Sequence, residues 1–296
     1  MLSIIISSYQ QTYYDQLIKN INETIGDRFT YEIIQIWNPN LMSITKAYNL
    51  GAEKAQYENI LFLHEDVIFH TKNWGGKLIS HLDQKNTGIV GVAGSSYVPA
   101  APSSWTVAEK YNFLNILQGN KQNTEYTHLH SMAGSTMKVF AVDGVFLAIK
   151  KEKYTPIRFD ENLKGFHGYD LDFSLRASQR FQNCIIDDIL IQHFSEGNLT
   201  KTWFDTNVAI KLKLGSNFNT STDSEVEKNV FNDFLYRYFT YYLINRKNIL
   251  FTLRFYPKKL KLKHHLEIMK KYFNYIRHSG SINEKNNLTK KNNQVI

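Results

Sequence analysis

The order of apolar and polar positions predicts alternating strands and helices in the first part of the chain. Continuous apolar runs, typical of strands buried on both faces, occur at 2–8, 31–37 and 60–67. Between these runs, apolar residues three or four positions apart predict helices at 12–25 and 43–56. Strand and helix repeat every ~25–30 residues, which is typical of a parallel sheet with right-handed crossovers.

The pattern continues in the same sense to about residue 200. Further helices are expected at 74–83 and 170–181, further strands at 88–94 and 184–191, and a pair of strands within 138–150. The segment 95–136 is rich in Ser, Pro, Asn, Gly and Thr, so we expect an irregular loop there. A loop of that length in a compact domain is usually functional or mobile.

Beyond residue 205 the sequence becomes helical and basic. Thr222 and Glu225 have the spacing of a capping box, which would begin a helix that continues to Tyr242. A basic and aromatic stretch follows, and the polar composition after residue 280 is typical of disorder. We therefore expect an α/β domain at 1–205, a helical basic appendage at 206–280 and a disordered tail at 281–296.

Composition narrows the class of protein. The chain is 43% hydrophobic and 14% aromatic, which is typical of a packed globular protein. A single cysteine, Cys184, excludes a disulfide framework and a Cys-rich zinc site, and it suits a reducing compartment. The first ten residues lack the basic region of a signal peptide, and no apolar run approaches the ~20 residues of a spanning helix. We expect a cytoplasmic protein, either in solution or peripheral on the inner face of the cell membrane.

The net charge of +8 is concentrated near the C-terminus. Residues 246–296 contain 13 Lys and Arg against 2 Asp and Glu, which leaves the rest of the chain slightly negative. Lysines interleaved with Phe, Tyr, Leu and Ile suit an anionic membrane surface. Structural packing, or a self-association surface in a homo-oligomer, is the alternative role for this region. Nucleic acid is the partner that we do not expect.

Polar side chains follow four of the predicted strands. These strand ends are Ser7–Tyr9, Trp37–Asn38, His64–Asp66 and Gln192–His193. In an open parallel sheet, ligands bind beyond the carboxyl ends of the strands, so these groups are expected along one rim. A carboxylate and an imidazole there could share a divalent ion, and Mn²⁺ or Mg²⁺ is the usual partner of a diphosphate.

A second polar cluster begins the helix predicted at 170–181. Gly165 and Gly168 would let the backbone approach a ligand closely. Asp170 and Asp172 lie in the first turn, where the helix dipole favours carboxylates. One of them could be the N-cap, and the other could face the cleft and accept a proton from a hydroxyl group.

Each of these residues also has a purely structural explanation. Asp66 could cap a solvated turn, Asp170 could cap a helix, and His193 could be a satisfied core histidine. Ser7 and Ser8 could terminate a strand, and His167 could pack in a turn. We expect structural roles for Glu65, for a buried Cys184, and for Asp172 as the partner of Arg176.

The same residues resemble the inverting nucleotide-sugar glycosyltransferases of the glycosyltransferase A fold, the family-2-like group. The similarity is greatest to a bacterial branch with His-x-Asp in place of Asp-x-Asp, and it covers roughly residues 2–200. The segments that carry it, in chain order, are IIISSY, ITKAYNLGAEKA, FLHEDV, VDGVFLAIKKE, FDENLKGFHGYDLDFSLRA and QHFSEG. The resemblance implies a Rossmann-like, mostly parallel sheet flanked by helices.

The resemblance also implies roles for individual residues. Asp170 would be the catalytic base, and Asp66 and His193 would bind the metal, Mn²⁺ or Mg²⁺. His167 and Tyr169 would contact the acceptor or the cleft. The nucleotide sugar would be bound by Ser7, Ser8, Tyr9, Asn38, Tyr48, Asn49, His64 and Asp143.

The function implied is a metal-dependent inverting glycosyltransferase. It would move a sugar from a nucleotide donor, with UDP the first choice, to a hydroxyl of a saccharide or lipid-linked acceptor in bacterial surface polysaccharide synthesis. The segment 95–136 would then be a mobile loop on the acceptor side.

Two alternatives remain open. A sugar nucleotidyltransferase would need a glycine-rich, basic loop after the first strand, and residues 8–12 contain neither Gly nor Lys. A catalytically degenerate module, binding a nucleotide sugar, a membrane or a partner, is favoured by two departures from the family pattern. These are His64 in place of an acid, and Tyr169 in place of the Glu that usually precedes the base.

Overall fold

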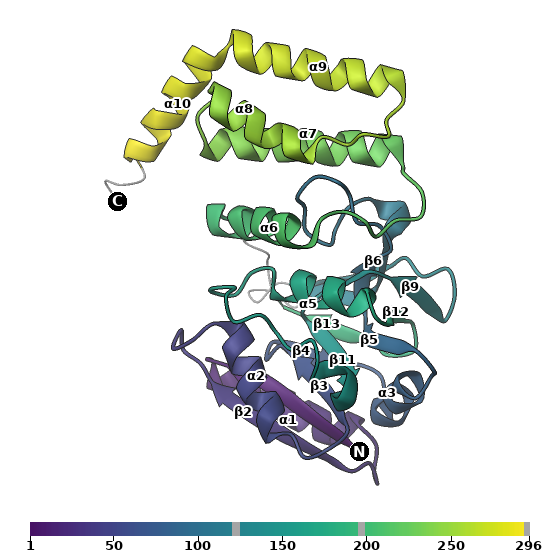
Figure 1. Ribbon diagram of the computed structural model, residues 1–296. Helices are drawn as coiled ribbons and strands as arrows, with labels where there is room; N and C mark the ends of the chain where they lie inside the picture. The colour runs from purple at the N-terminus through teal and green to yellow at the C-terminus, as the bar shows by residue number, and fades with distance from the viewer. Residues whose placement is uncertain (120–124, 195–198, 293–296) are drawn as a thin grey trace. The chain divides into compact units, whose positions relative to one another are not determined.

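The computed structural model describes residues 1–119, 125–194 and 199–292, with the backbone alone from residue 287 (Figure 1). The chain divides into two compact units. The first unit contains Met1–Val98 and Ser104–Leu199, and the second contains Pro99–Ser103 and Thr200–Ile296. The break after Leu199 lies close to the boundary expected at residue 205, whereas the excursion of 99–103 into the second unit has no counterpart in the predicted domains.

Seven strands form the main sheet of the first unit, in the order β2-β1-β3-β11-β5-β12-β9. They are β1 (Leu2–Ser8), β2 (Tyr31–Trp37), β3 (Asn59–Leu63), β5 (Thr87–Gly91), β9 (Thr136–Val139), β11 (Phe146–Lys150) and β12 (Gln182–Ile186). β1 pairs in parallel with β2 and β3, and β12 pairs in parallel with β5, whereas β11 and β9 are antiparallel to their neighbours. Five strands therefore run in one direction, which confirms the predicted mostly parallel sheet.

Helices cover both faces of this sheet because alternate strand residues point to opposite sides. On one face, Ile4 and Ile6 belong to the same core as residues of α1 (Gln11–Thr24) and α3 (Trp74–Leu82). On the other face, Ile5 and Phe62 share a core with α2 (Ile44–Lys54) and α5 (Tyr169–Ser178). The short helix α4 (Lys151–Tyr154) follows β11 and contributes Tyr154 to this second core.

A smaller mixed sheet contains the order β10-β6-β7-β13-β4, with β8 paired to β7. Its strands are β4 (Val67–Phe69), β6 (Ala93–Ser95), β7 (Asn112–Gly119), β8 (Tyr126–His130), β10 (Ala141–Val142) and β13 (Ile191–His193). The 3-10 turn η1 (Glu109–Tyr111) leads into β7.

This second sheet overturns several sequence predictions. The segment 95–136 is not an irregular loop, because β7 and β8 pair within it. Every residue of β8 is exposed. The pairing of β8 with β7 is made by main-chain hydrogen bonds, so the sequence of β8 shows no pattern of apolar residues that would predict a strand. The single strands expected at 88–94 and 184–191 are each divided between the two sheets, and the pair expected within 138–150 is three strands.

The second unit is helical around an aromatic core that includes Phe204, Phe231 and Phe234. Its elements are α6 (Lys201–Leu214), α7 (Ser224–Tyr241), α8 (Arg246–Thr252), η2 (Leu253–Phe255), α9 (Leu262–Arg277) and α10 (Ser279–Asn292). The capping box at Thr222 is wrong, because the carboxylate of Asp223 accepts the backbone N–H groups of Glu225 and Val226. The tail expected to be disordered from 281 is helical to 292, and residues 293–296 lie outside the described part.

Two buried charged residues explain why 99–103 belongs to the second unit. The Nζ of Lys211 donates to the carbonyl of Pro99 at 2.6 Å, and a carboxylate oxygen of Glu227 accepts the N–H of Ala100 at 2.9 Å. Burial lowers the pKa of Lys211 to about 8.

In the described part of the chain, no helix is both long enough and apolar enough to span a bilayer.

Helix α2 lies unusually close to β1, and a glycine permits this. A Cβ placed on Gly51 would lie 2.3 Å from Cγ2 of Ile5, a distance that forces one of the two elements to move. By contrast, a Cβ on Gly76, an exposed residue of α3, would meet no atom within 4 Å. The two helical glycines, Gly51 and Gly76, therefore provide a matched test and control for the effect of an added Cβ.

We expect Gly51→Ala to lower the free energy of unfolding by about 1–3 kcal/mol, because it overpacks the α2–β1 contact. Gly76→Ala should be neutral or stabilising by up to ~1 kcal/mol, since it only lowers the entropy of the unfolded chain. Thermal denaturation of both variants beside the wild type measures the difference. Equal melting temperatures for the two variants would show that the close contact does not constrain the fold.

Candidate metal and active site

The candidate site forms where the chain passes from one sheet to the other. β3 ends at Leu63, residues 64–66 turn, and β4 then enters the smaller sheet. There β4 pairs antiparallel with β13, so that Val67 lies opposite His193. The N–H of Phe194 donates to the carbonyl of Asp66 at 3.2 Å, which extends this pairing to the turn. Pairing across a long sequence separation therefore brings His193 beside Asp66.

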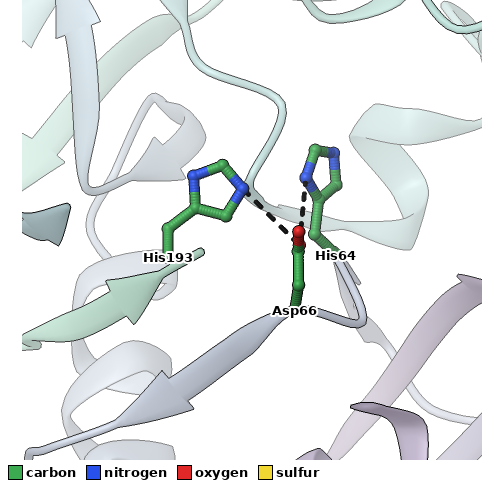
Figure 2. A group of neighbouring side chains, drawn as sticks. All are labelled: His64, Asp66 and His193. Atoms are coloured by element: carbon green, nitrogen blue, oxygen red, sulfur yellow. Dashed lines mark ion pairs between the residues drawn. The ribbon is translucent and has the colours of Figure 1, made fainter. Parts of the chain in front are cut away.

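Three side chains converge at this point: His64, Asp66 and His193 (Figure 2). Nδ1 of His64 lies 3.9 Å from Oδ1 of Asp66, and Nε2 of His193 lies 3.5 Å from the same oxygen. One donor atom from each residue lies within 4.8 Å of the other two. Asp66 and His193 come together as predicted, and His64, predicted as a nucleotide-sugar contact, belongs to the same group.

The surroundings of His193 fit a bound cation. Within the described part of the chain, its Nε2 is buried and has no hydrogen-bond partner. A buried polar atom without a partner costs free energy, so such an atom is usually explained by an ion or a water molecule. A carboxylate and two imidazoles that face one another supply the donors that a divalent transition metal prefers. The residues present therefore fit the predicted metal.

Tyr169 fixes the orientation of His64 from the opposite side. Its hydroxyl lies 2.6 Å from Nε2 of His64, which leaves Nδ1 to face Asp66. Burial raises the pKa of Tyr169 well above its usual value, so the hydroxyl keeps its proton. If Nδ1 bound a cation, Nε2–H would donate to this oxygen, as metal-binding histidines usually donate to a neighbouring acceptor.

The carboxylate of Glu65 has the structural role that we expected. It is buried, and one of its oxygens accepts the N–H groups of Tyr9 and Gln10 at 3.0 and 3.1 Å. These bonds join the end of β1 to the end of β3. Of the three residues that follow β3, Glu65 thus holds the rim of the sheet together, whereas His64 and Asp66 face the site.

A pair of carboxylates lies near the start of α5. Asp143 accepts the N–H of Val145 at 2.8 Å and the indole N–H of Trp105 at 2.6 Å. Asp170 accepts the N–H of Gly144 at 3.2 Å. Burial, and then the negative charge of Asp143, raise the pKa of Asp170 to about 7. A carboxylate with a pKa near neutrality is well matched to proton transfer.

Glycines permit this close packing. A Cβ on Gly144 would lie 2.1 Å from the hydroxyl oxygen of Tyr169 and 3.1 Å from Cβ of Asp170. Gly168, at φ 69°, is the N-cap of α5, so neither Asp170 nor Asp172 is the cap that we expected. Asp172 is fully buried and paired with Arg176, which confirms its predicted partner.

Three residues that we predicted to contact the nucleotide sugar are buried and packed or hydrogen-bonded within the protein. Tyr48 is fully buried among aromatic rings that include Phe62. Asn49 is buried as well, and its amide is bonded to both the N–H and the carbonyl of Phe159. Asn38 closes the loop after β2 through two bonds to the backbone of Met42. A helix or strand-end position near a ligand does not reveal whether its side chain points toward the ligand or into the core.

The remaining predicted residues lie around the rim. Ser8 is buried and accepts from Gln35 at 2.9 Å, while Ser7 accepts weakly from Asn38 at 3.4 Å. Tyr9 is half exposed at the end of β1. His167 lies in the turn before α5, and burial lowers its pKa. Ser195–Gly197, part of the last segment of the resemblance, lie outside the described residues.

Sequence reasoning missed two residues of the site. Trp105 lies in the segment predicted to be irregular, and only the folded chain brings its indole to Asp143. Gly144 lies in a sequence that resembles a strand, where a glycine is not conspicuous. Its importance is visible only in the short distance from an added Cβ to the hydroxyl oxygen of Tyr169. For Gly144, the dipeptide Asp143–Gly144 is a local signal, because it is typical of a tight turn.

Solved structures share the fold of this chain at low sequence identity. GalNAc-T7 with UDP, GalNAc and Mn²⁺ is 11% identical with a TM-score of 0.50, covering 79% of this chain and 54% of that one. S. aureus TarS is 11% identical with a TM-score of 0.55, covering 96% and 53%. S. aureus TarS 1–349 with UDP-GlcNAc is 11% identical with a TM-score of 0.53, covering 96% and 88%. The chain thus spans about half the length of the first two proteins.

The mixed sheet flanked by helices is that of the glycosyltransferase A fold, as predicted. A search of the curated proteins found no match. The sequence does match the glycosyltransferase-like family over residues 3–228, a range that contains every residue of the site described above. The chain therefore belongs to the glycosyltransferase-like family.

Proposed function

We propose that this protein transfers a sugar from a nucleotide sugar to a hydroxyl group, with inversion at the anomeric carbon. The observation that carries the proposal is the convergence of His64, Asp66 and His193 within 4.8 Å at the carboxyl end of β3. In an open α/β sheet this is the edge at which ligands bind. Membership of the glycosyltransferase-like family supports the same reaction class.

The donor that we propose is a UDP-sugar. Two of the proteins that share the fold have UDP or UDP-GlcNAc bound in their structures, and one of them has Mn²⁺. In this chain, Ser7 and the half-exposed Tyr9 at the end of β1 remain candidates for contacts with the nucleoside. The acceptor that we propose is a hydroxyl of a saccharide or lipid-linked saccharide in bacterial surface polysaccharide synthesis.

His64, Asp66 and His193 would hold a divalent cation. When bound, such a cation offsets the negative charge of the diphosphate in the donor and in the leaving group. Two imidazoles among three ligands favour Mn²⁺ over Mg²⁺, because Mg²⁺ binds oxygen almost exclusively. Tyr169 keeps the imidazole of His64 in the orientation that this role requires.

Asp170 would be the general base. Its carboxylate takes the proton of the acceptor hydroxyl while the acceptor oxygen forms a bond to the anomeric carbon. The bond from that carbon to the diphosphate oxygen breaks, and its electron pair leaves with the nucleoside diphosphate. Attack opposite the leaving group inverts the configuration. The raised pKa of about 7 strengthens Asp170 as a base.

The metal role predicts that Asp66→Ala abolishes Mn²⁺ binding to the chelator-treated protein, measured by calorimetry. The same variant should lose metal-dependent binding of UDP-sugars, tested with a panel of nucleotide sugars. Asp15→Ala, which removes an exposed carboxylate of α1, is the matched control and should bind as the wild type does. If the wild type binds no nucleotide sugar at millimolar concentration with Mn²⁺ present, the transferase proposal is wrong and a degenerate binding module is favoured.

The base role predicts that kcat/KM rises with pH and levels off above the Asp170 pKa of about 7. Asp143→Asn should shift this rise to lower pH, because the variant removes the like charge that raises the pKa of Asp170. Asp170→Asn should retain donor binding and lose about 10²–10⁴-fold in turnover. A pH profile that Asp143→Asn leaves in place would show that another group titrates.

Asp170 should also affect stability. Its folded-state pKa lies above the ordinary value of 3.8, so the folded protein loses stability as pH rises from about 4 to about 7. Asp170→Asn should therefore raise the free energy of unfolding above pH 7 by roughly 1–3 kcal/mol, and the gain should vanish near pH 4. Thermal denaturation across this pH range measures it, and a variant less stable at high pH would contradict the assignment.

A further inference from the structure

Helix α9 has one apolar face that is already covered. His264, Ile268 and Tyr272 are buried, and the two apolar residues of this set belong to the same core as residues of α7. Ser224 bonds to Nδ1 of His264 at 2.8 Å, and Lys271 donates to the carbonyl of Asn232 at 2.9 Å. These contacts fix how α9 is rotated about its own axis within the second unit.

A second apolar face of α9 points to solvent. It consists of Leu262, Leu266, Met269, Phe273 and Ile276, each between 53% and 75% exposed. The alternating spacing of four and three residues places all five within roughly 80° of the helix circumference. Single exposed apolar residues need no explanation, but a continuous stripe of large ones marks a binding surface.

A row of positive charge borders this stripe. Lys263, Lys270 and Arg277 are exposed, seven residues apart, and adjacent to the stripe along one edge. Glu267 is the only acid in α9, and its carboxylate lies 3.3 Å from Nζ of Lys228 in α7. The exposed surface is therefore apolar and cationic, with its one negative charge turned toward a lysine of the unit itself.

The charges beside the apolar stripe of α9 argue against a second copy of this chain as the partner that covers the stripe. If two α9 stripes packed antiparallel, the basic rows would face each other and repel. If they packed parallel, each row would face the opposite edge of the stripe, where α9 has His265 and no acid. A surface rich in phosphate or carboxylate groups with an apolar interior would satisfy both features of the stripe at once.

The second unit has another surface of the same character on α8 and η2. A depression of about 740 Å³ is lined by Arg246, Lys247 and Arg254 together with Leu250 and Phe251, and its lining contains no acid. Leu250 is 56% exposed. Cations placed beside exposed aliphatic side chains, twice within one unit, are the pattern of a surface that lies in the headgroup region of a bilayer.

We propose that the outer face of α9 docks on an anionic lipid bilayer. The apolar stripe lies among the acyl chains nearest the headgroups, and Lys263, Lys270 and Arg277 contact lipid phosphates. The helix lies parallel to the membrane plane. This inference concerns the second unit and does not require the proposed transfer reaction, so the two can fail separately.

The test is flotation of the full chain with vesicles, without donor or metal. Wild type should float with vesicles that mix phosphatidylglycerol and phosphatidylcholine, and it should not float with phosphatidylcholine alone. Replacing Lys263, Lys270 and Arg277 with Gln should weaken binding on the order of a hundredfold, at roughly fivefold for each charge. Replacing the exposed Met269 and Phe273 with Ser should weaken binding to a similar degree.

The matched control removes three exposed lysines of the first unit, as Lys19→Gln, Lys54→Gln and Lys85→Gln, and should bind as wild type does. This comparison separates a local surface from net charge. Equal loss in both triple variants, or unchanged binding of the Met269 and Phe273 variant, would overturn the proposal. So would sedimentation of the wild type as a dimer that the Met269 and Phe273 substitutions dissociate, because a second copy would then cover the stripe.

Discussion

The antiparallel pairing of β4 with β13 is the contact on which the candidate site depends. Residues 64–66 carry the chain out of the main sheet, and β4 is only three residues long, so its partner strand fixes where the turn lies. The bond from the N–H of Phe194 to the carbonyl of Asp66 then places His193 opposite the carboxylate. Without this pairing, residues more than a hundred positions apart would have no reason to meet.

The same region shows how stability and chemistry oppose each other. Asp143 and Asp170 lie close enough for one charge to raise the pKa of the other, in surroundings that already disfavour a carboxylate. Backbone N–H groups of Val145 and Gly144 offset part of that cost. The fold thus maintains a carboxyl group of near-neutral pKa at the expense of its own stability, a cost that is common at functional sites.

In the second unit, the helix α9 has two apolar faces with different surroundings. In α9, one apolar face supplies the contact with α7, while the other remains in water beside a basic row. An amphipathic helix of an ordinary domain has one apolar face, because the opposite face is solvated. Two such faces on one helix separate the residues that hold the unit together from those available to bind another surface.

The sequence by itself determined the strand–helix order, the mostly parallel main sheet, the change in character near residue 200, and the chemical types at the strand ends. These follow from local periodicity, since apolar runs and helical spacing are readable without knowing which segments pair. It also identified Asp66 and His193 as candidate ligands, and it suggested a structural Glu65.

Only the tertiary structure decided which polar groups face the site. Tyr48 and Asn49 point into the core, whereas Trp105 reaches Asp143 from a segment predicted to be irregular. It also divided 88–94 and 184–191 between two sheets, because strand pairing depends on main-chain hydrogen bonds that side-chain patterns do not encode. Periodicity reveals that a face of α9 is apolar, but exposure, which decides whether that face is core or surface, is a property of the packed chain.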